Sequence, residues 1–124
     1  MQTLLDALPT KKIRGRLPET VTGLAFDSRR VKAGACFVAV PGLKENGRRF
    51  IPEALARGAS LVVAEGDDPL PEREQGRILV PSAREALARL ADAYFGHPSA
   101  QLLVVGITGT NGKTTTSYFV EALL

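Results

Sequence analysis

The sequence predicts an α/β domain with a mainly parallel sheet, and two features predict it. The first is an alternation, along the first hundred residues, of short continuous apolar runs with stretches that carry helix signals. Such alternation is typical of parallel strands joined by helices. The second is an apolar run, Leu102 to Val105, that leads directly into a glycine-rich turn and a further helix signal. Uninterrupted aliphatic runs of this length indicate strands that are buried on both faces.

The first half of the chain alternates between apolar runs and polar turns. Thr3 to Leu8 is expected to form a short amphipathic helical turn that a proline ends. Val21 to Phe26 mixes β-branched and apolar residues and indicates a strand, which stops at the polar turn Asp27-Ser-Arg-Arg30. Cys36 to Val40 is a continuous apolar strand closed by a Pro-Gly pair, and Leu43 to Arg49 is a glycine-containing polar loop.

The next elements follow the same order of helix and strand. Pro52 to Arg57 predicts a helix, since Pro52 occupies a favourable first-turn position and Gly58 provides the stop. Leu61 to Ala64 then indicates another buried strand. After an acidic, proline-bearing loop from Glu65 to Gly76, Arg77 to Pro81 gives one more short strand.

The strongest helix signal of the chain follows that strand. Ser82-Ala-Arg-Glu85 is a capping box, and Gly96 occupies the position expected of a glycine that ends a helix. At helical spacing, one face collects four residues that are expected to pack on the core: Ala86, Leu87, Leu90 and Tyr94. His97 to Ala100 is then expected to be a linker.

A nucleotide-phosphate site is indicated by the turn after Leu102 to Val105. The general phosphate-loop pattern fails by one position, because Ile107 stands where its first glycine belongs, but the compact form Gly109-Thr-Asn-Gly-Lys-Thr fits. Backbone amides of such a turn can surround a phosphate, Lys113 adds a positive charge, and the Thr114 hydroxyl can hold Mg²⁺. The helix that begins here is expected to direct Phe119, Val120 and Leu123 toward a core. The alternative, an ordinary glycine-rich turn, has no use for a lysine followed by three hydroxyls.

Composition and charge narrow the class of protein. The 124 residues are enough for one core, with 44% hydrophobic and 23% charged residues, which is ordinary for a globular chain. No stretch approaches the ~18 apolar residues of a membrane helix, and no secretory signal begins the chain, so we expect a soluble, cytoplasmic protein. The net charge of +3 comes from small basic groups without interleaved aromatics, which argues against a nucleic-acid partner.

The two residues most often recruited for chemistry have ordinary roles in this sequence. The single Cys36, within Ala-Cys-Phe-Val-Ala-Val, is expected to be a buried small hydrophobe, which agrees with a reducing compartment. His97 is the only histidine, and without a cluster of other ligands we expect a linker or helix-end residue and not a metal site.

Four segments of this sequence together resemble the N-terminal part of the Mur ligases. These are Val21 to Val31, Lys32 to Gly42, Asn46 to Ala59, and Gly106 to Thr116. The Asp-Ser-Arg segment and the phosphate loop are independent motifs that occur in the expected order, and the resemblance covers nearly the whole chain from Val21 onward. It is closest to the MurE type. The MurF type shares the Asp-Ser/Thr-Arg segment, but its phosphate loop typically has serine or cysteine where Thr110 and Asn111 stand.

The resemblance implies an ATP-dependent, ADP-forming amide ligase of peptidoglycan synthesis, with ATP and Mg²⁺ as cofactors. The MurE type adds the third amino acid to UDP-N-acetylmuramoyl-L-alanyl-D-glutamate. Residues 1–99 are then expected to be a Rossmann-like domain that binds the uridine diphosphate end of the substrate. Residues 100–124 would be the first strand, phosphate loop and helix of an ATPase domain that is incomplete in this chain. The implied partners are that nucleotide peptide and an amino acid, without nucleic acid or membrane, and we expect a monomer.

The resemblance also assigns site residues. The ATP site would contain Gly109, Thr110, Asn111, Gly112, Lys113, Thr114 and Thr115, with Lys113 as the catalytic residue on the β- and γ-phosphates and Thr114 beside Mg²⁺. The nucleotide substrate would contact Phe26, Ser28, Leu43, Lys44 and Glu45, with Ser28 as a hydrogen-bond donor. Some relatives have histidine where Leu43 stands and aspartate where Asn46 stands, so contacts through backbone amides are the expectation for this loop.

Several alternatives stay open from the sequence. The Asp27-Ser-Arg segment taken alone is typical of a capped turn. Arg48 and Arg49 are as well explained by a solvated pair as by a diphosphate. A MurF-type ligase, a stand-alone module that binds UDP-sugars, and a phosphate-loop regulator without ligase chemistry are the competing functions, and the sequence does not say which amino acid a ligase would add.

Overall fold

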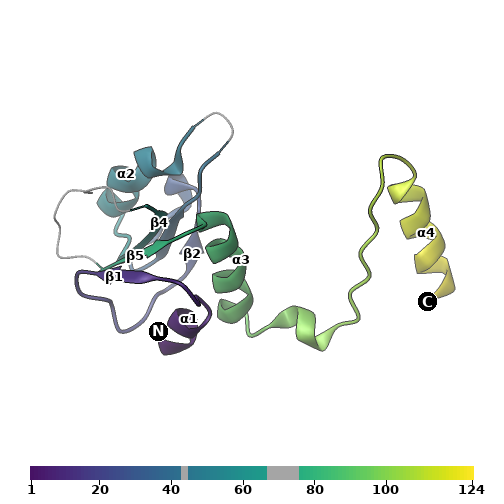
Figure 1. Ribbon diagram of the computed structural model, residues 1–124, viewed down its shortest axis with the longest axis horizontal. Coiled ribbons are helices and arrows are strands. Elements are labelled where there is room, and N and C mark those ends of the chain that lie inside the picture. Colours follow the sequence, from purple (N-terminus) through teal and green to yellow (C-terminus); the bar gives the residue numbers. More distant parts are fainter. Residues whose placement is uncertain (43–44, 67–75) are drawn as a thin grey trace.

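A computed structural model describes residues 1–42, 45–66 and 76–124 and confirms a mixed α/β fold (Figure 1). Five strands form one sheet in the order β1-β5-β4-β3-β2. The strands are β1 (Lys12–Arg14), β2 (Leu24–Ala25), β3 (Cys36–Ala39), β4 (Leu61–Glu65) and β5 (Gly76–Val80). Neighbours from β2 to β5 are parallel, and β1 alone runs antiparallel, along β5. The expected mainly parallel sheet is therefore confirmed.

Three helices cover the two faces of this sheet: α1 (Gln2–Asp6), α2 (Ile51–Ala56) and α3 (Ala83–Tyr94). A further helix, α4 (Lys113–Leu123), lies away from the sheet (Figure 1), and the 3₁₀ turns are η1 (Ser28–Arg30), η2 (Gly47–Phe50) and η3 (Pro98–Gln101). Successive residues of a strand point to opposite faces, and the buried residues divide accordingly. Cys36 and Val38 pack with α1 and α3, whereas Phe37 and Ala39 pack with α2. The result is a three-layer domain with a core on each side of the sheet.

Helix α3 forms where the sequence predicts it, for the predicted reasons. Ser82 is its N-cap and accepts a hydrogen bond from the Glu85 amide at 3.2 Å, which satisfies one of the free amides at a helix start. Gly96 follows the C-cap with φ of 75°, a conformation that glycine adopts without strain. Ala86 and Leu90 are buried as expected and Leu87 is partly buried. Tyr94 differs from the expectation, since it is 37% exposed and its hydroxyl donates to the Thr22 carbonyl at 3.1 Å.

Two features of the sheet differ from expectation. Strand β1 is absent from the sequence-based prediction, since its three exposed residues contain a single apolar one, Ile13, and are held by pairing with β5. The predicted strand Val21–Phe26 shortens to Leu24–Ala25, because β2 pairs only with the first half of β3.

Cys36 is fully buried, as predicted, and burial raises the pKa of its thiol to about 12.

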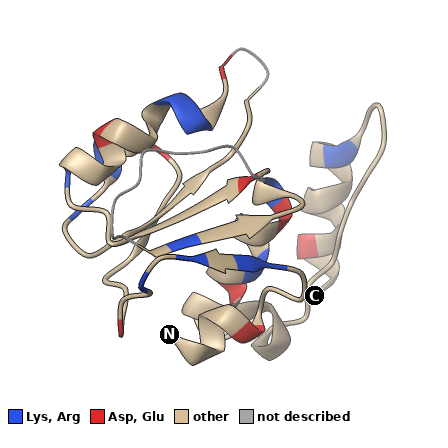
Figure 2. Cartoon of the chain, turned by 60° about the vertical axis from the view of Figure 1, so that its left-hand side comes forward, with Lys and Arg blue, Asp and Glu red and all other residues tan. Residues whose placement is uncertain are grey.

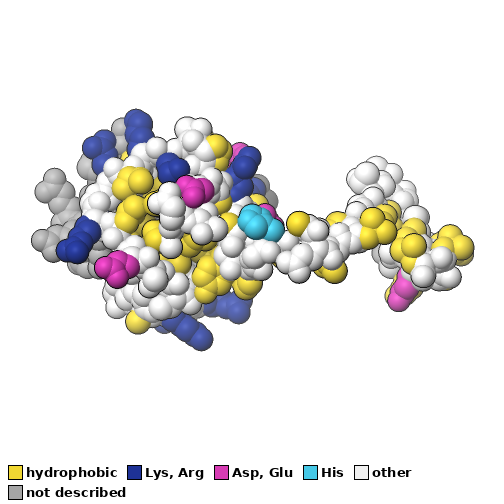
Figure 3. All heavy atoms as spheres, turned by 90° about the horizontal axis from the view of Figure 1, so that it is seen from below, with side chains coloured by type: hydrophobic (Ala, Val, Ile, Leu, Met, Phe, Trp, Pro, Cys, Tyr) yellow, Lys and Arg dark blue, Asp and Glu magenta, His cyan; other side chains and the backbone are white. Residues whose placement is uncertain are grey.

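The expectation of a buried strand at Leu102 to Val105 is wrong for this structure. These residues are exposed, with 54% to 85% of the surface of each residue accessible to solvent, and they pair with no strand in the described part of the chain. Helix α4 does form, but Phe119 and Leu123 are exposed and do not face a core. Figure 3 shows hydrophobic side chains along this part of the surface. An apolar run becomes a buried strand only beside a neighbour that accepts its backbone hydrogen bonds.

The basic residues are distributed over several elements and not gathered on one face, as Figure 2 shows. No helix among the described residues is long and apolar enough to cross a membrane. Within the same residues, no group of histidine, cysteine, aspartate and glutamate is arranged to hold a metal ion.

Candidate nucleotide site

The segments predicted to bind the substrate leave the sheet side by side. Strands β2 and β3 are parallel neighbours, with Ala25 opposite Phe37, so Asp27 follows the end of β2 at the level where β3 ends. Each strand leads into a 3₁₀ turn, η1 after β2 and η2 after β3. Ligands of parallel α/β sheets bind beyond the carboxyl ends of the strands, and these two turns lie at that edge.

The first turn is closed by Asp27. Its side chain accepts from the Arg29 amide at 3.0 Å and forms a two-point pair with the Arg29 guanidinium, at 3.0 and 2.7 Å. These hydrogen bonds lower the pKa of Asp27 to about 2. The capped-turn interpretation of this segment is therefore correct as a description of its local structure. It also means that Arg29 is neutralised by its neighbour and is a weaker candidate for a phosphate contact than Arg30.

Ser28 is buried in this turn, with 5% of its surface exposed. Its hydroxyl donates to Glu53 Oε2 at 2.7 Å, across to helix α2. A hydroxyl has one proton to donate, so in this conformation Ser28 has none left for a phosphate oxygen. The predicted role of Ser28 as a donor to the substrate would require this hydrogen bond to break, whereas its oxygen can still accept.

The second turn is built around a glycine that no other residue could replace without movement. Asn46 caps η2 by accepting from the Arg48 amide at 3.0 Å, and the Gly42 amide donates to the Glu45 carbonyl at 2.9 Å. A Cβ on Gly47 would lie 2.8 Å from the Val40 amide nitrogen. Glu45 is exposed at this loop, and the predicted contacts Leu43 and Lys44 lie outside the described residues.

The two arginines left open by the sequence differ in their surroundings. Arg49 is exposed and lies 4.0 Å from Glu45, a distance typical of a weak surface pair. Arg48 lies beside Gly66, just after β4, where a Cβ on that glycine would be 3.3 Å from Arg48 Nη1. Arg48 is thus placed at the same carboxyl edge as the two turns.

A hollow of about 390 Å³ lies beside the first turn. It runs along the edge strand β2 from Thr22 to Asp27, and Arg30 and Lys32 also line it. Lys32 lies at the amino end of this hollow, because the carbonyl of the next residue accepts from the Thr22 hydroxyl at 2.8 Å. The Phe26 side chain is largely exposed, at 64%. An exposed aromatic ring and an arginine at one end of a hollow can stack on a base and attract phosphate oxygens.

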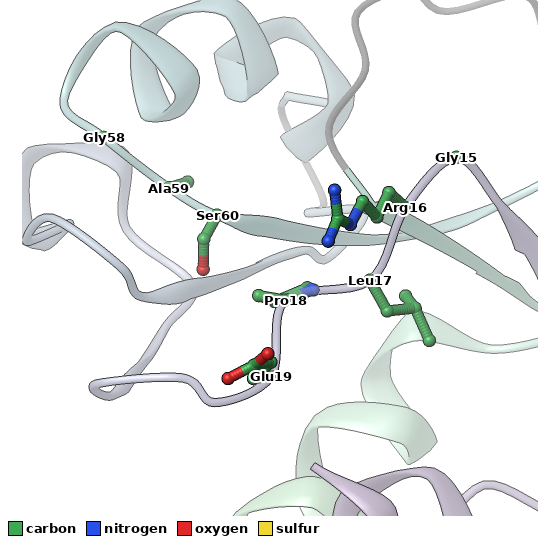
Figure 4. A pocket seen from close by; sticks show the side chains of 8 residues that line it. All are labelled: Gly15, Arg16, Leu17, Pro18, Glu19, Gly58, Ala59 and Ser60. Atoms are coloured by element: carbon green, nitrogen blue, oxygen red, sulfur yellow. The ribbon is translucent and has the colours of Figure 1, made fainter.

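A larger hollow, drawn in Figure 4, lies at the opposite edge of the sheet. It is lined by Gly15 to Glu19, which follow β1, and by Gly58 to Ser60, which precede β4. It therefore opens at the amino ends of β4 and β5, and none of the predicted site residues lines it. The Ser60 hydroxyl already donates to the Gly34 carbonyl at 2.8 Å.

Two polar residues that support the carboxyl edge were missed by sequence reasoning. Arg84, in the first turn of α3, donates to the Pro41 carbonyl at 3.2 Å, and Glu65 accepts from the Ala83 amide at 2.7 Å. Their partners are 43 and 18 residues away in the chain, so no local pattern could have revealed them. Glu53, the partner of Ser28, was missed for the same reason.

The predicted ATP loop has the form of a strand-to-helix turn. Gly109 and Gly112 have φ of 152° and 76°, and helix α4 begins at Lys113. The Lys113 ammonium donates to the Gly109 carbonyl at 2.6 Å, so it closes the loop upon itself. Thr110, Asn111, Thr114 and Thr115 are all exposed around it. The amides at this helix start, the lysine and the Thr114 hydroxyl form a donor set that fits a Mg²⁺-bound triphosphate.

The structure does not bring the ATP loop to the other predicted residues. Figure 1 shows the segment after α3 running away from the sheet and ending in α4. The connection begins at His97, which has a left-handed backbone (φ 56°) and whose Nδ1 lies 2.7 Å from Asp92 Oδ2. His97 is thus a helix-end residue, as predicted.

Comparison with known proteins agrees with these features. A family model described as "Mur ligase family, catalytic domain" matches residues 20–95, more than half of the chain. The chain belongs to the Mur ligase family. Members of this family are ATP-dependent amide ligases of peptidoglycan precursor synthesis. The matched range contains both turns at the carboxyl edge, whereas the ATP loop follows it.

Individual Mur ligases extend the similarity over most of the chain. The UDP-N-acetylmuramoyl-L-alanyl-D-glutamate–2,6-diaminopimelate ligase of Solibacter usitatus is 51% identical over 104 residues, which are 84% of this chain and 21% of that protein. The crystal structure of MurF from Acinetobacter baumannii matches 93% of this chain and 25% of its own, with a TM-score of 0.73 and 28% identity. The crystal structure of MurF from Thermotoga maritima in complex with ADP matches 75% of this chain and 21% of its own, with a TM-score of 0.56 and 38% identity. The chain thus spans a quarter or less of these relatives.

Proposed function

We propose that this chain supplies the nucleotide-substrate domain, residues 1–99, and the start of the ATP-binding domain, residues 100–124, of a MurE-type ligase. The reaction is the ADP-forming addition of the third amino acid to UDP-N-acetylmuramoyl-L-alanyl-D-glutamate. The observation that carries the proposal is the pair of capped turns at one carboxyl edge, with the exposed Phe26 and Arg30 beside them. The relative from S. usitatus, whose name states this step, supports it.

At the substrate end, the uridine diphosphate is assigned to the carboxyl edge of β2 and β3. Phe26 offers a ring face to the base, and Arg30 offers charge to the diphosphate. The turn at Ser28 and the loop through Leu43, Lys44 and Glu45 complete the site, with backbone amides of the loop as the expected donors.

At the ATP end, residues Gly109 to Thr115 hold the triphosphate. Lys113 leaves the Gly109 carbonyl to contact the β- and γ-phosphates. The Thr114 hydroxyl would help to hold Mg²⁺, which would supply positive charge against the transferring phosphoryl group. The substrate carboxylate takes the γ-phosphoryl group and ADP leaves. The amine of the amino acid then attacks the carbonyl carbon, loses a proton and expels phosphate, so that an amide forms. Activation is needed because a carboxylate is a poor electrophile until one oxygen becomes a good leaving group.

The substrate end is tested by titrating the chain with UDP while backbone amide shifts are recorded. Shifts should concentrate at residues 26–30 and 43–46. Shifts that cluster elsewhere, for example along Gly15 to Glu19 of the opposite hollow, would refute this placement.

The ATP end is tested in the full-length enzyme. Lys113→Ala should reduce ADP formation by about 100-fold or more, the usual scale for losing a group that stabilises charge in the transition state. The matched control is Glu121→Ala, which removes a charged side chain from the far end of the same helix, α4. ADP formation at the normal rate in Lys113→Ala would exclude the assigned role.

A MurF-type ligase is the second candidate, because MurF structures match the fold. The two are distinguished by offering the full-length enzyme a nucleotide dipeptide with a free amino acid, or a nucleotide tripeptide with a dipeptide amine. ATP hydrolysis that requires neither amine would instead support a regulator. We further propose a monomeric enzyme in the cytoplasm; the buried, unpaired Cys36 supports the reducing compartment.

A further inference from the structure

The first turn is attached to helix α2 by a chain of polar contacts. Ser28 donates to Glu53 Oε2 at 2.7 Å, and the other oxygen of Glu53 accepts from Arg57 Nε at 3.1 Å. Arg57 in turn lies 3.4 Å from the Arg29 carbonyl oxygen, as a long donor contact. Glu53 is therefore bonded to the turn directly and again through Arg57.

Helix α2 presents Glu53 to the turn because its other face is committed to the core. Ile51, Ala54 and Leu55 are buried against the sheet, while Glu53 lies in the first turn of the helix. A carboxylate is favoured near a helix start. The hydrogen bond from Ser28 is the main cause that lowers the pKa of Glu53, so Glu53 accepts as a carboxylate at neutral pH.

We propose that Glu53 is a positioning residue for nucleotide binding, which holds the Ser28 turn on α2 and thereby fixes Phe26 and Arg30 against the ligand. This inference rests on the proposed binding of UDP at this turn. Phe26 and Arg30 line the hollow, whereas Ser28 does not line it and faces α2. Ser28 and Glu53 therefore act on the ligand through the backbone of the turn.

Removing either partner of this pair should have the same effect on the ligand. Without Glu53, the buried Ser28 hydroxyl loses its acceptor, and the turn can relax away from α2. Hydrogen bonds to charged groups are strong enough for a loss of about 10-fold in affinity. Because both residues act through one contact, the double variant should be no worse than the single ones.

The experiment measures UDP affinity and thermal unfolding of the chain for the wild type, Glu53→Ala, Glu53→Gln, Ser28→Ala and the double alanine variant. Glu85→Ala is the matched control, because Glu85 also lies in the first turn of a helix and pairs with an arginine four residues later, Arg89, at 2.9 Å. We expect Glu53→Ala and Ser28→Ala to weaken UDP binding by about 10-fold, with the double variant equal to either. Glu53→Gln retains an acceptor oxygen and should rescue most of the affinity, and Glu85→Ala should bind like the wild type.

The outcomes separate this inference from the proposed function. If the wild type does not bind UDP, the proposed function fails and this inference with it. If the wild type binds UDP and Glu53→Ala binds equally well, or if the two single losses add in the double variant, only the positioning role is overturned. If Glu53→Ala does not fold, Ser28→Ala and Glu53→Gln decide the same question. A purely structural role of the pair would lower the thermal stability of these variants without changing the UDP affinity of the folded chain.

Discussion

Replacing Gly47 by alanine tests whether the second turn is fixed by close packing. A Cβ at this position would lie 2.8 Å from the Val40 nitrogen and 2.9 Å from the Ala39 carbonyl carbon, with the Val40 carbonyl oxygen nearer still. Ordinary contacts of a Cβ begin at 3.4 Å, so the shortfall to the Val40 nitrogen is about 0.6 Å. All three obstructing atoms are backbone, and they belong to or directly follow β3, which pairs with a strand on each side. The loop, and not the strand, must therefore move.

The size of the effect follows from this geometry. Forcing an extra carbon into a packed region costs about 1–3 kcal/mol. For a domain of this size, 1 kcal/mol corresponds to about 4–8 °C in melting temperature, so the midpoint of Gly47→Ala should fall by roughly 4–24 °C. Because Asn46 and η2 move with Gly47, UDP binding should weaken as well. Thermal unfolding followed by circular dichroism and a UDP titration measure the two effects.

The matched control for the melting temperature is Gly23→Ala. Gly23 precedes β2, has no atom within 4 Å of a built Cβ, and is not among the glycines with positive φ. Alanine should be neutral there, or stabilising by about 0.4–1 kcal/mol through the unfolded chain. If Gly47→Ala melts with the wild type and binds UDP equally well, close packing against Val40 does not fix the loop, and the reasoning is refuted.

Three further predictions concern the first turn, the core and helix α3. Asp27 has a pKa of about 2, against 3.8 for an ordinary aspartate carboxyl, so its stabilising pair with Arg29 is complete above about pH 4 and is lost toward pH 2. In urea denaturation, the free energy of unfolding of Asp27→Asn should therefore lie below that of the wild type at pH 7 and converge with it near pH 2. A difference that stays constant with pH would contradict this. With a thiol pKa raised to about 12 by burial, Cys36 should react with a thiol reagent at pH 8 only as fast as the chain unfolds, and rapid labelling of the native chain would disprove that. Ser82→Ala should cost about 1 kcal/mol by removing the α3 cap, visible as a lower melting temperature, whereas Ser82→Asp should melt close to the wild type.

The sequence predicted well those elements whose signals are local. The Ser82 capping box and Gly96 bound α3 correctly, because a cap and a left-handed glycine act within a few residues. Continuous aliphatic runs located β3 and β4, since only a strand covered on both faces uses such residues at every position. The same rule was wrong for Leu102 to Val105, which meets no neighbouring strand in the described structure.

In the candidate site, too, the local features were predicted from the sequence and the long-range contacts were not. The capped turn at Asp27 and the glycine loop at Gly47 were visible as motifs, and their place after strands made a shared edge predictable. What the motif could not say was how Ser28 is used, because its partner Glu53 is 25 residues away. The roles of the individual ATP-loop and substrate residues remain predictions.

By itself, then, the sequence determined the strands of a mainly parallel α/β sheet, the capped turn at Asp27 and the glycine-rich turn before α4. Each of these signals lies within a few residues, as does the Asp27–Arg29 pair that closes the first turn. Only the tertiary structure decided which polar groups are engaged across the fold: Ser28 with Glu53, and Arg84 with the Pro41 carbonyl. These contacts join distant parts of the chain, so they exist only once the helices have packed on the sheet, and they determine which groups at the carboxyl edge remain available to a ligand.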